Sequence, residues 1–225
     1  MSSVDTNTLV NDLVENKVYV WTTRADYFPK VTDSMILWTK DKQIVIDPSK
    51  IAEKLVSIKE KVDSFKKEWK NIVVILDKEA FQEEVKDVCT ASWVSFLNNK
   101  VPSGIFTNFE TFGRRIHSLN KLKKFIESPA FEKITKKEQL MKKRELEKLQ
   151  TVYEGVTNLS KLPDLVIVVD AEYNSWVIRE LEKVNIPYVA IANTNLSRYL
   201  KTSDLLVMNT NSYESVTYVL NYLLK

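Results

Sequence analysis

The sequence predicts an α/β protein in which a parallel sheet is flanked by helices and carries a protruding antiparallel α-helical hairpin. Short runs of apolar, often β-branched residues, such as 72–76 and 165–169, are typical of strands buried on both faces. Amphipathic helical stretches alternate with these runs, which favours a parallel sheet covered by helices on both sides. One highly charged segment in the middle of the chain breaks the alternation, and it predicts the hairpin.

The strands are expected wherever a short apolar run lies between polar or turn-forming residues. We expect them at residues 18–20, 44–46, 72–76, 93–97, 165–169, 188–192 and 205–208. Connected by helices, such strands give the layering seen in flavodoxin-like and Rossmann-like folds.

The clearest helix begins near Asp47-Pro48-Ser49, because Asp caps a helix start and Pro fits its first turn. Its apolar residues recur every three or four positions, as expected for a helix with one buried face. These residues are Ile51, Leu55, Ile58, Val62 and Phe65. Further helices are expected over residues 81–88, 176–184 and 216–224. The single cysteine, Cys89, is expected to be a buried apolar residue on a helix.

The middle segment predicts two helices folded back on one another. A narrow apolar seam suited to helix-on-helix packing comprises Phe109, Phe112, Ile116, Leu119, Leu122 and Ile126. Ser128-Pro129 interrupts the seam, and Thr135 with Glu138 forms a capping box that restarts a helix. We therefore expect residues 1–106 and 159–225 to form the α/β domain. Residues 107–158 would be an inserted, coiled-coil-like hairpin that projects from it.

The basic charge of the chain is concentrated in this segment. Between Arg114 and Lys148 there are twelve Lys or Arg and five acids, a net charge of +7. The whole chain carries only +3, so the remainder carries −4. A patch of this kind is the usual electrostatic footprint for a polyanion, and it favours binding to the phosphates of RNA.

The residues that enzymes need are missing from the sequence. The three glycines are far apart, so neither a G-x-G-x-x-G motif nor a P-loop can be written. His117, the only histidine, has no partner at the spacing of a catalytic triad or a zinc site. Asp170 resembles a metal-holding acid at the end of a strand, but a turn or helix-entry role is favoured. We expect no catalytic residue, metal, cofactor or small-molecule substrate, and no apolar run approaches the roughly 20 residues of a membrane span.

Several segments, in order along the chain, resemble the small-subunit ribosomal protein S2 family. The strongest are ITKKEQLM (134–141) and RELEKL (144–149), which are similar to the run in the family's hairpin. Others are TN (107–108), LPD (162–164) before VIVVD (166–170), IPYVAI (186–191) and NTN (193–195), with weaker similarity at FPK (28–30) and ID (46–47). The chain departs from the family's pattern where it has lost glycines, for example before LPD, so it resembles a divergent member.

The resemblance implies a non-enzymatic, structural constituent of the small ribosomal subunit. Its partners would be small-subunit rRNA near the junction of head and body and neighbouring small-subunit ribosomal proteins, including ribosomal protein S1 in many bacteria. The residues expected to contact rRNA are Arg114, Arg115, Lys121, Lys123, Lys124, Lys136, Lys137, Lys142, Lys143 and Arg144, and, from motif position, Arg24, Lys30, Thr107 and Asn108.

Two alternatives remain open at this point. The chain could be a non-ribosomal α/β module whose basic hairpin binds nucleic acid or a protein partner. Its ribosome could be the cytoplasmic, bacterial-type particle or that of a mitochondrion or plastid, because the N-terminal sequence, with Asp5 and Asp12 and no early Arg, resembles no typical targeting peptide.

Overall fold

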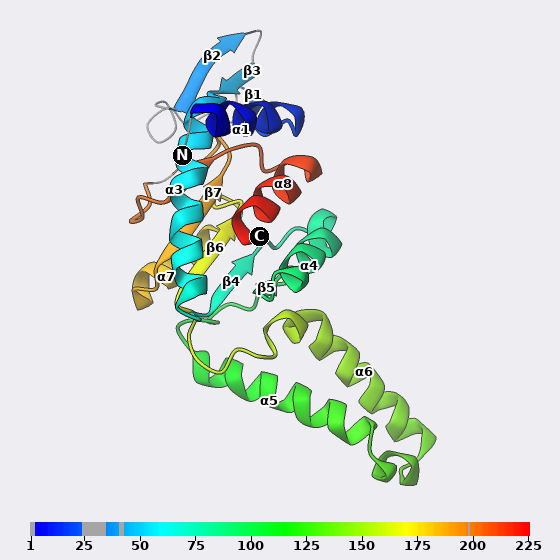
Figure 1. Cartoon of the computed structure of the whole chain (residues 1–225). Coiled ribbons are helices and arrows are strands. Elements are labelled where there is room, and N and C mark those ends of the chain that lie inside the picture. The colour runs from blue at the N-terminus through cyan, green and yellow to red at the C-terminus, as the bar shows by residue number, and fades with distance from the viewer. Residues whose placement is uncertain (1–2, 24–34, 41–42, 198) are drawn as a thin grey trace.

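The computed structural model describes residues 3–23, 35–40, 43–197 and 199–225. Its centre is a five-stranded sheet with the strand order β5-β4-β6-β7-β8 (Figure 1). The strands are β4 (Ile72–Ile75), β5 (Ser95–Leu97), β6 (Leu165–Val169), β7 (Tyr188–Ala192) and β8 (Leu205–Val207). All neighbouring pairs are parallel. The second strand lies at one edge and the others follow in chain order, as in flavodoxin-like sheets, so the predicted fold class is confirmed.

Successive side chains of the central strands enter two separate cores. Val74 and Ile167 pack in one hydrophobic cluster, and Val73 and Val166 pack in the other. All four side chains are almost completely buried. This burial explains why the strands are continuous apolar runs, since side chains point alternately to opposite faces and both faces are covered.

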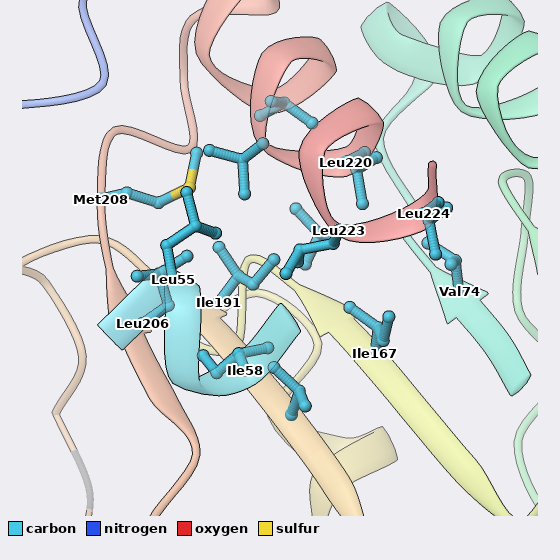
Figure 2. Packing of buried hydrophobic residues seen from close by; sticks show 14 of the residues in the cluster. Leu55, Ile58, Val74, Ile167, Ile191, Leu206, Met208, Leu220, Leu223 and Leu224 are labelled. Carbon is cyan, nitrogen blue, oxygen red and sulfur yellow. The ribbon is translucent and has the colours of Figure 1, made fainter. Parts of the chain in front are cut away.

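Three of the described helices cover the first face of the sheet, and a fourth packs beside them. The three are α3 (Pro48–Lys67), α4 (Gln82–Ala91) and α8 (Tyr213–Leu224), and α1 (Ser3–Glu15) packs against α3 and joins the same core. Figure 2 shows Leu55 of α3 and Leu220 and Leu223 of α8 gathered over Ile167 and Ile191 of the sheet. The helix α3 begins as predicted: Pro48 occupies its first turn, and the amide of Ser49 donates to Asp47 Oδ1 at 3.0 Å. Cys89 is buried on α4, as expected.

The second face is covered by α7 (Ser175–Val184) and by the first turns of α5 (Phe109–Ile126). Val177 and Leu181 of α7 share a hydrophobic cluster with Phe112 and Ile116 of α5. The predicted hairpin is therefore rooted in the core of the α/β body.

Beyond its root the hairpin extends away from the sheet (Figure 1). A short 3₁₀ helix, η4 (Pro129–Lys133), connects α5 to α6 (Lys136–Tyr153), and η5 (Glu154–Val156) leads back to the body. Four side chains of α5 are buried, whereas none of α6 is buried. The seam of α5 thus follows the prediction, and α6 lies against it as a largely solvated helix.

A small antiparallel sheet, which the sequence did not predict, lies near the N-terminus. Its strands are β1 (Val20–Thr23), β2 (Ile36–Lys40) and β3 (Gln43–Ile46), in the order β1-β3-β2. Residues 44–46 lie in β3, as expected, whereas the strand expected at 18–20 begins only at Val20. The antiparallel pairing of β3 with β1 and β2 was not expected. Among the residues that the structure describes, no helix is both long and apolar enough to cross a lipid bilayer.

Candidate nucleic-acid interface

The loop that leads into α5 is held by one carboxylate of the body. Gly104, with φ of +81°, forms a turn that glycine adopts without strain. The amides of Gly104 and Phe106 donate to the two carboxylate oxygens of Glu180 in α7, at 2.5 and 3.2 Å. The amide of Asn108 then donates to the carbonyl oxygen of Gly104 at 2.8 Å. These bonds fix the position of Thr107 and Asn108, which are both exposed.

Aromatic contacts hold both ends of the hairpin, between α5 and α6 at the root and between α5 and η4 at the tip. At the root, the rings of Phe112 and Tyr153 lie 5.5 Å apart between centroids. Near the tip, Phe125 and Phe131 meet edge to face at 6.0 Å. The side-chain amide of Gln139 also donates to the carbonyl oxygen of Phe131 at 3.1 Å. Rings at both ends restrict how α6 can move against α5, so the cations between them are held on a defined scaffold.

The predicted capping box starts α6. Thr135 Oγ1 accepts a hydrogen bond from the amide of Glu138 at 3.3 Å and donates to Glu138 Oε2 at 2.8 Å. The amide of Thr135 donates to the same carboxylate at 3.0 Å. These hydrogen bonds, with that from the Thr135 hydroxyl first, hold the pKa of Glu138 below its ordinary value. The prediction of this motif is confirmed.

The cations predicted to bind RNA are spread along both helices and face solvent. Lys123 and Lys142 are half-buried, and the other cations predicted on the two helices are exposed. Those exposed side chains are Arg114, Arg115, Lys121, Lys124, Lys136, Lys137, Lys143 and Arg144. Because they lie on a scaffold whose apolar seam faces inward, their charges are presented outward. Such an arrangement can contact the phosphates of a polyanion at many points.

A few of these cations have partners within the hairpin. Arg114 pairs with Glu110 at 2.5 Å, and Lys142 pairs with Glu145 at 2.8 Å. Lys143 Nζ lies 5.9 Å from the centre of the Phe131 ring. Both ion pairs are exposed, where such pairs are weak, so a phosphate can replace the carboxylate at little cost.

The structure brings together only some of the predicted side chains. Arg115 and Asn108 line one cavity of about 140 Å³ at the root of the hairpin. The cations of α6 near residues 142–144 lie along the projecting part. Arg24 and Lys30 lie outside the described residues. His117 is exposed on α5, and it lines a hollow together with Arg114.

Asp170 has the turn role that the sequence favoured, with a partner that was not foreseen. It is buried at the end of β6 with φ of +57°, and the amide of Tyr173 donates to its Oδ1 at 3.3 Å. It forms an ion pair with Lys78, which follows β4, and Lys78 also donates to Asn211 at 3.2 Å. Lys78 thus neutralises the buried carboxylate between two adjacent strand ends.

Sequence reasoning missed two exposed tryptophans, Trp69 and Trp93. Trp93 was expected to begin a strand, which is wrong, because β5 starts at Ser95. Both residues have positive φ, 55° and 56°, and lie just after a helix. A tryptophan at the junction of an amphipathic helix and a buried strand, where Gly or Asn is usual, is the signal that could have found them.

Comparison with known proteins identifies the family. The family model described as "Ribosomal protein S2" matches residues 13–225. The chain is 38% identical, over 124 residues, to "Small ribosomal subunit protein uS2" of Pseudoalteromonas translucida, which covers 55% of this chain and 51% of that protein. It is 34% identical, over 151 residues, to the uS2 protein of Coprothermobacter proteolyticus, which covers 67% of this chain and 56% of that protein.

The aligned part of this chain thus spans about half the length of these curated relatives. The family model nevertheless covers nearly the whole chain, from the end of α1 through the hairpin to the last residue. The match agrees with the resemblance noted at the TKKE and RELEKL motifs and with the prediction of a ribosomal protein rather than an enzyme. The chain belongs to the ribosomal protein S2 family.

Proposed function

We propose that this chain is a structural constituent of the small ribosomal subunit and binds small-subunit rRNA near the junction of head and body. The observation that carries the proposal is the row of exposed cations on α5 and α6 in a member of a ribosomal protein family. The two matched relatives are named as small-subunit proteins, which supports the same assignment.

The cations would contact phosphates rather than bases. Lys and Arg on a projecting helix pair reach a backbone without entering a groove, and structured RNA is recognised mostly by shape and backbone. Each neutralised phosphate releases counterions, so affinity should fall steeply with salt and depend little on sequence. The α/β body would remain available to neighbouring small-subunit proteins.

Co-sedimentation with small ribosomal subunits tests the proposal. The occupancy of the particle is compared between the unaltered chain and a variant in which three hairpin cations are replaced by glutamate. Lys142→Glu, Lys143→Glu and Arg144→Glu together should lower occupancy of the particle at least about tenfold, since three phosphate contacts become repulsive. The matched control is Lys100→Glu, Arg179→Glu and Lys183→Glu, which changes three exposed cations of the body by the same charge. Equal occupancy of the two triple variants would contradict the assignment to the hairpin, and failure of the unaltered chain to co-sediment would contradict the ribosomal function itself.

A further inference from the structure

Trp69 and Trp93 occupy a position that folding does not explain. Their side chains are 94% and 97% exposed, so neither indole contributes to a core. Each residue also has positive φ, a conformation that costs energy for any residue with a Cβ atom. A large apolar ring in a strained backbone position and in contact with water is unfavourable for the free protein on both counts.

Both tryptophans close a helix in the same way. After α3, the amide of Trp69 donates to Lys66 and the amide of Lys70 donates to Phe65, both at 3.0 Å. After α4, the amide of Trp93 donates to Thr90 at 3.2 Å, and that of the next residue donates to Cys89 at 3.0 Å. This is the Schellman ending, whose left-handed residue is usually Gly and sometimes Asn.

The helix α7 shows what this turn requires in the same fold. Asn185 is its left-handed residue, with φ of 60°, and the amide of Ile186 donates to Leu181 at 3.0 Å. A small polar residue is thus sufficient to turn the chain from a helix into the next parallel strand. The indoles of Trp69 and Trp93 therefore need another explanation.

The two tryptophans line one surface cavity. Their helices precede β4 and β5, which are hydrogen-bonded neighbours with Val73 opposite Ser95. Both tryptophans line a cavity of about 310 Å³ at the amino ends of these strands. The other residues that line it are Lys66, Lys70, Asn71, Ile72, Ser92, Val94 and Ser95.

The lining of this cavity suits a nucleic acid better than a protein. The cavity is lined by two lysines, asparagine and serine, and by no carboxylate. Lys66 donates to the carbonyl oxygen of Leu224, and Lys70 forms an exposed ion pair with Glu68 at 2.6 Å. An exposed pair of this kind is weak, so a phosphate can replace the carboxylate. Tryptophan is enriched in protein–protein interfaces, but lysine and serine, which supply most of the polar lining here, are depleted in them. Single-stranded nucleic acids, in contrast, are held by aromatic rings on which bases stack and by cations that follow the backbone.

We propose that Trp69 and Trp93 form a stacking site for unpaired RNA bases. The indoles would stack on bases, Lys70 and the adjacent exposed Lys67 would lie near phosphates, and Asn71 would be available to base edges. The proposal rests on the proposed function in so far as RNA is the partner, but it concerns a site separate from the hairpin cations.

The site lies at the amino ends of the strands. In Figure 1, β4 points away from the hairpin, so its amino end lies on the hairpin side of the sheet.

Binding of fluorescein-labelled single-stranded hexa-adenylate RNA tests the site. The parent protein for this experiment is the full-length chain with Lys142→Glu, Lys143→Glu and Arg144→Glu. These substitutions keep the hairpin from dominating RNA binding. In this background, Trp69→Gly and Trp93→Gly together should weaken binding at least about tenfold, because each stacked base accounts for about fivefold or more. Glycine is chosen because it adopts positive φ without strain and preserves both turns.

Two further variants make the outcome specific. Trp69→Phe with Trp93→Phe should retain affinity within about threefold, because phenylalanine also provides a stacking surface. Tyr173→Ala with Tyr213→Ala, which removes two other exposed aromatic rings, should leave affinity unchanged. Urea unfolding of each variant establishes that it is folded.

Two results would overturn the stacking site. They are equal affinity of the Gly variant and its parent, and no binding of the oligonucleotide by the parent. Equal affinity would mean that the tryptophans serve a protein partner instead of RNA. Neither result depends on whether the hairpin cations direct incorporation into the particle, so the two proposals fail separately.

Discussion

Gly155 lies so close to Phe96 that no side chain can be added to it. A Cβ atom at Gly155 would be 2.3 Å from the carbonyl oxygen of Phe96 and 2.6 Å from its ring. Phe96 belongs to β5, one of the two edge strands of the five-stranded sheet, and Gly155 lies in η5, where the hairpin returns to the body. Close backbone contact at this point holds the second arm of the hairpin against the sheet.

Gly155→Ala should therefore lower the free energy of unfolding by about 1–3 kcal/mol, as overpacking does. Chemical denaturation in urea measures the change. The matched control is Gly113→Ala, because Gly113 lies inside α5 and an added Cβ would meet nothing within 4 Å. There alanine should stabilise the protein by about 0.5–1 kcal/mol. Equal effects of the two substitutions would contradict the contact.

The start of α6 should loosen in acid. The pKa of Glu138 is lowered in the folded protein, so its hydrogen bonds stabilise the helix start above the ordinary carboxyl pKa and are lost as the pH falls through the folded value. Amide exchange of Glu138, corrected for its intrinsic pH dependence, should lose protection in acid, at pH values below the ordinary pKa of a glutamate carboxyl. Glu138→Gln, which cannot ionise, should show no such pH dependence, and an identical profile in both proteins would refute the role of the carboxylate.

Cys89 should make the protein less stable at high pH. Burial raises the pKa of its thiol to about 12, although the charge of Lys66 opposes this shift. An unfolded thiol ionises near pH 8.5, so above that value the unfolded state loses a proton that the folded state keeps. Stability should fall by about 1.5 kcal/mol between pH 8.5 and 10 from this group alone.

Urea unfolding of the unaltered chain and of Cys89→Ala at both pH values isolates the effect. Other groups titrate equally in the two proteins, so the difference between them reports the thiol. The native thiol should also resist a disulfide reagent at pH 8 until urea is added. Rapid modification in the absence of urea would show that the thiol is accessible.

The sequence was most informative where one physical requirement dominates. The strands at residues 165–169 and 188–192 were placed correctly at both ends, because full burial on both faces leaves only apolar residues. The capping box was equally clear, since its two residues bond to each other locally. The small antiparallel sheet was missed because its strands are only four or five residues long and because β1 joins it through pairing of Val20 with the distant Val45.

Helix ends were harder to place because this chain uses unusual residues there. Lys17, Trp69 and Trp93 adopt positive φ at positions where glycine would have signalled a turn. The pairing of Lys78 with Asp170 was also invisible, since only the strand order brings residues 92 positions apart to one edge. The hairpin cations could be listed from charge alone, but their exposure and partners required the structure.

The salt dependence of rRNA binding tests the central claim most directly. The affinity of the chain for small-subunit rRNA is measured between about 50 and 200 mM salt, for the unaltered chain and for Lys142→Gln, Lys143→Gln and Arg144→Gln together. If the three cations neutralise phosphates, the slope of log affinity against log salt should become shallower by about 2–3, and the affinity should fall. An unchanged slope and an unchanged affinity would contradict the claim that the hairpin binds RNA through these residues.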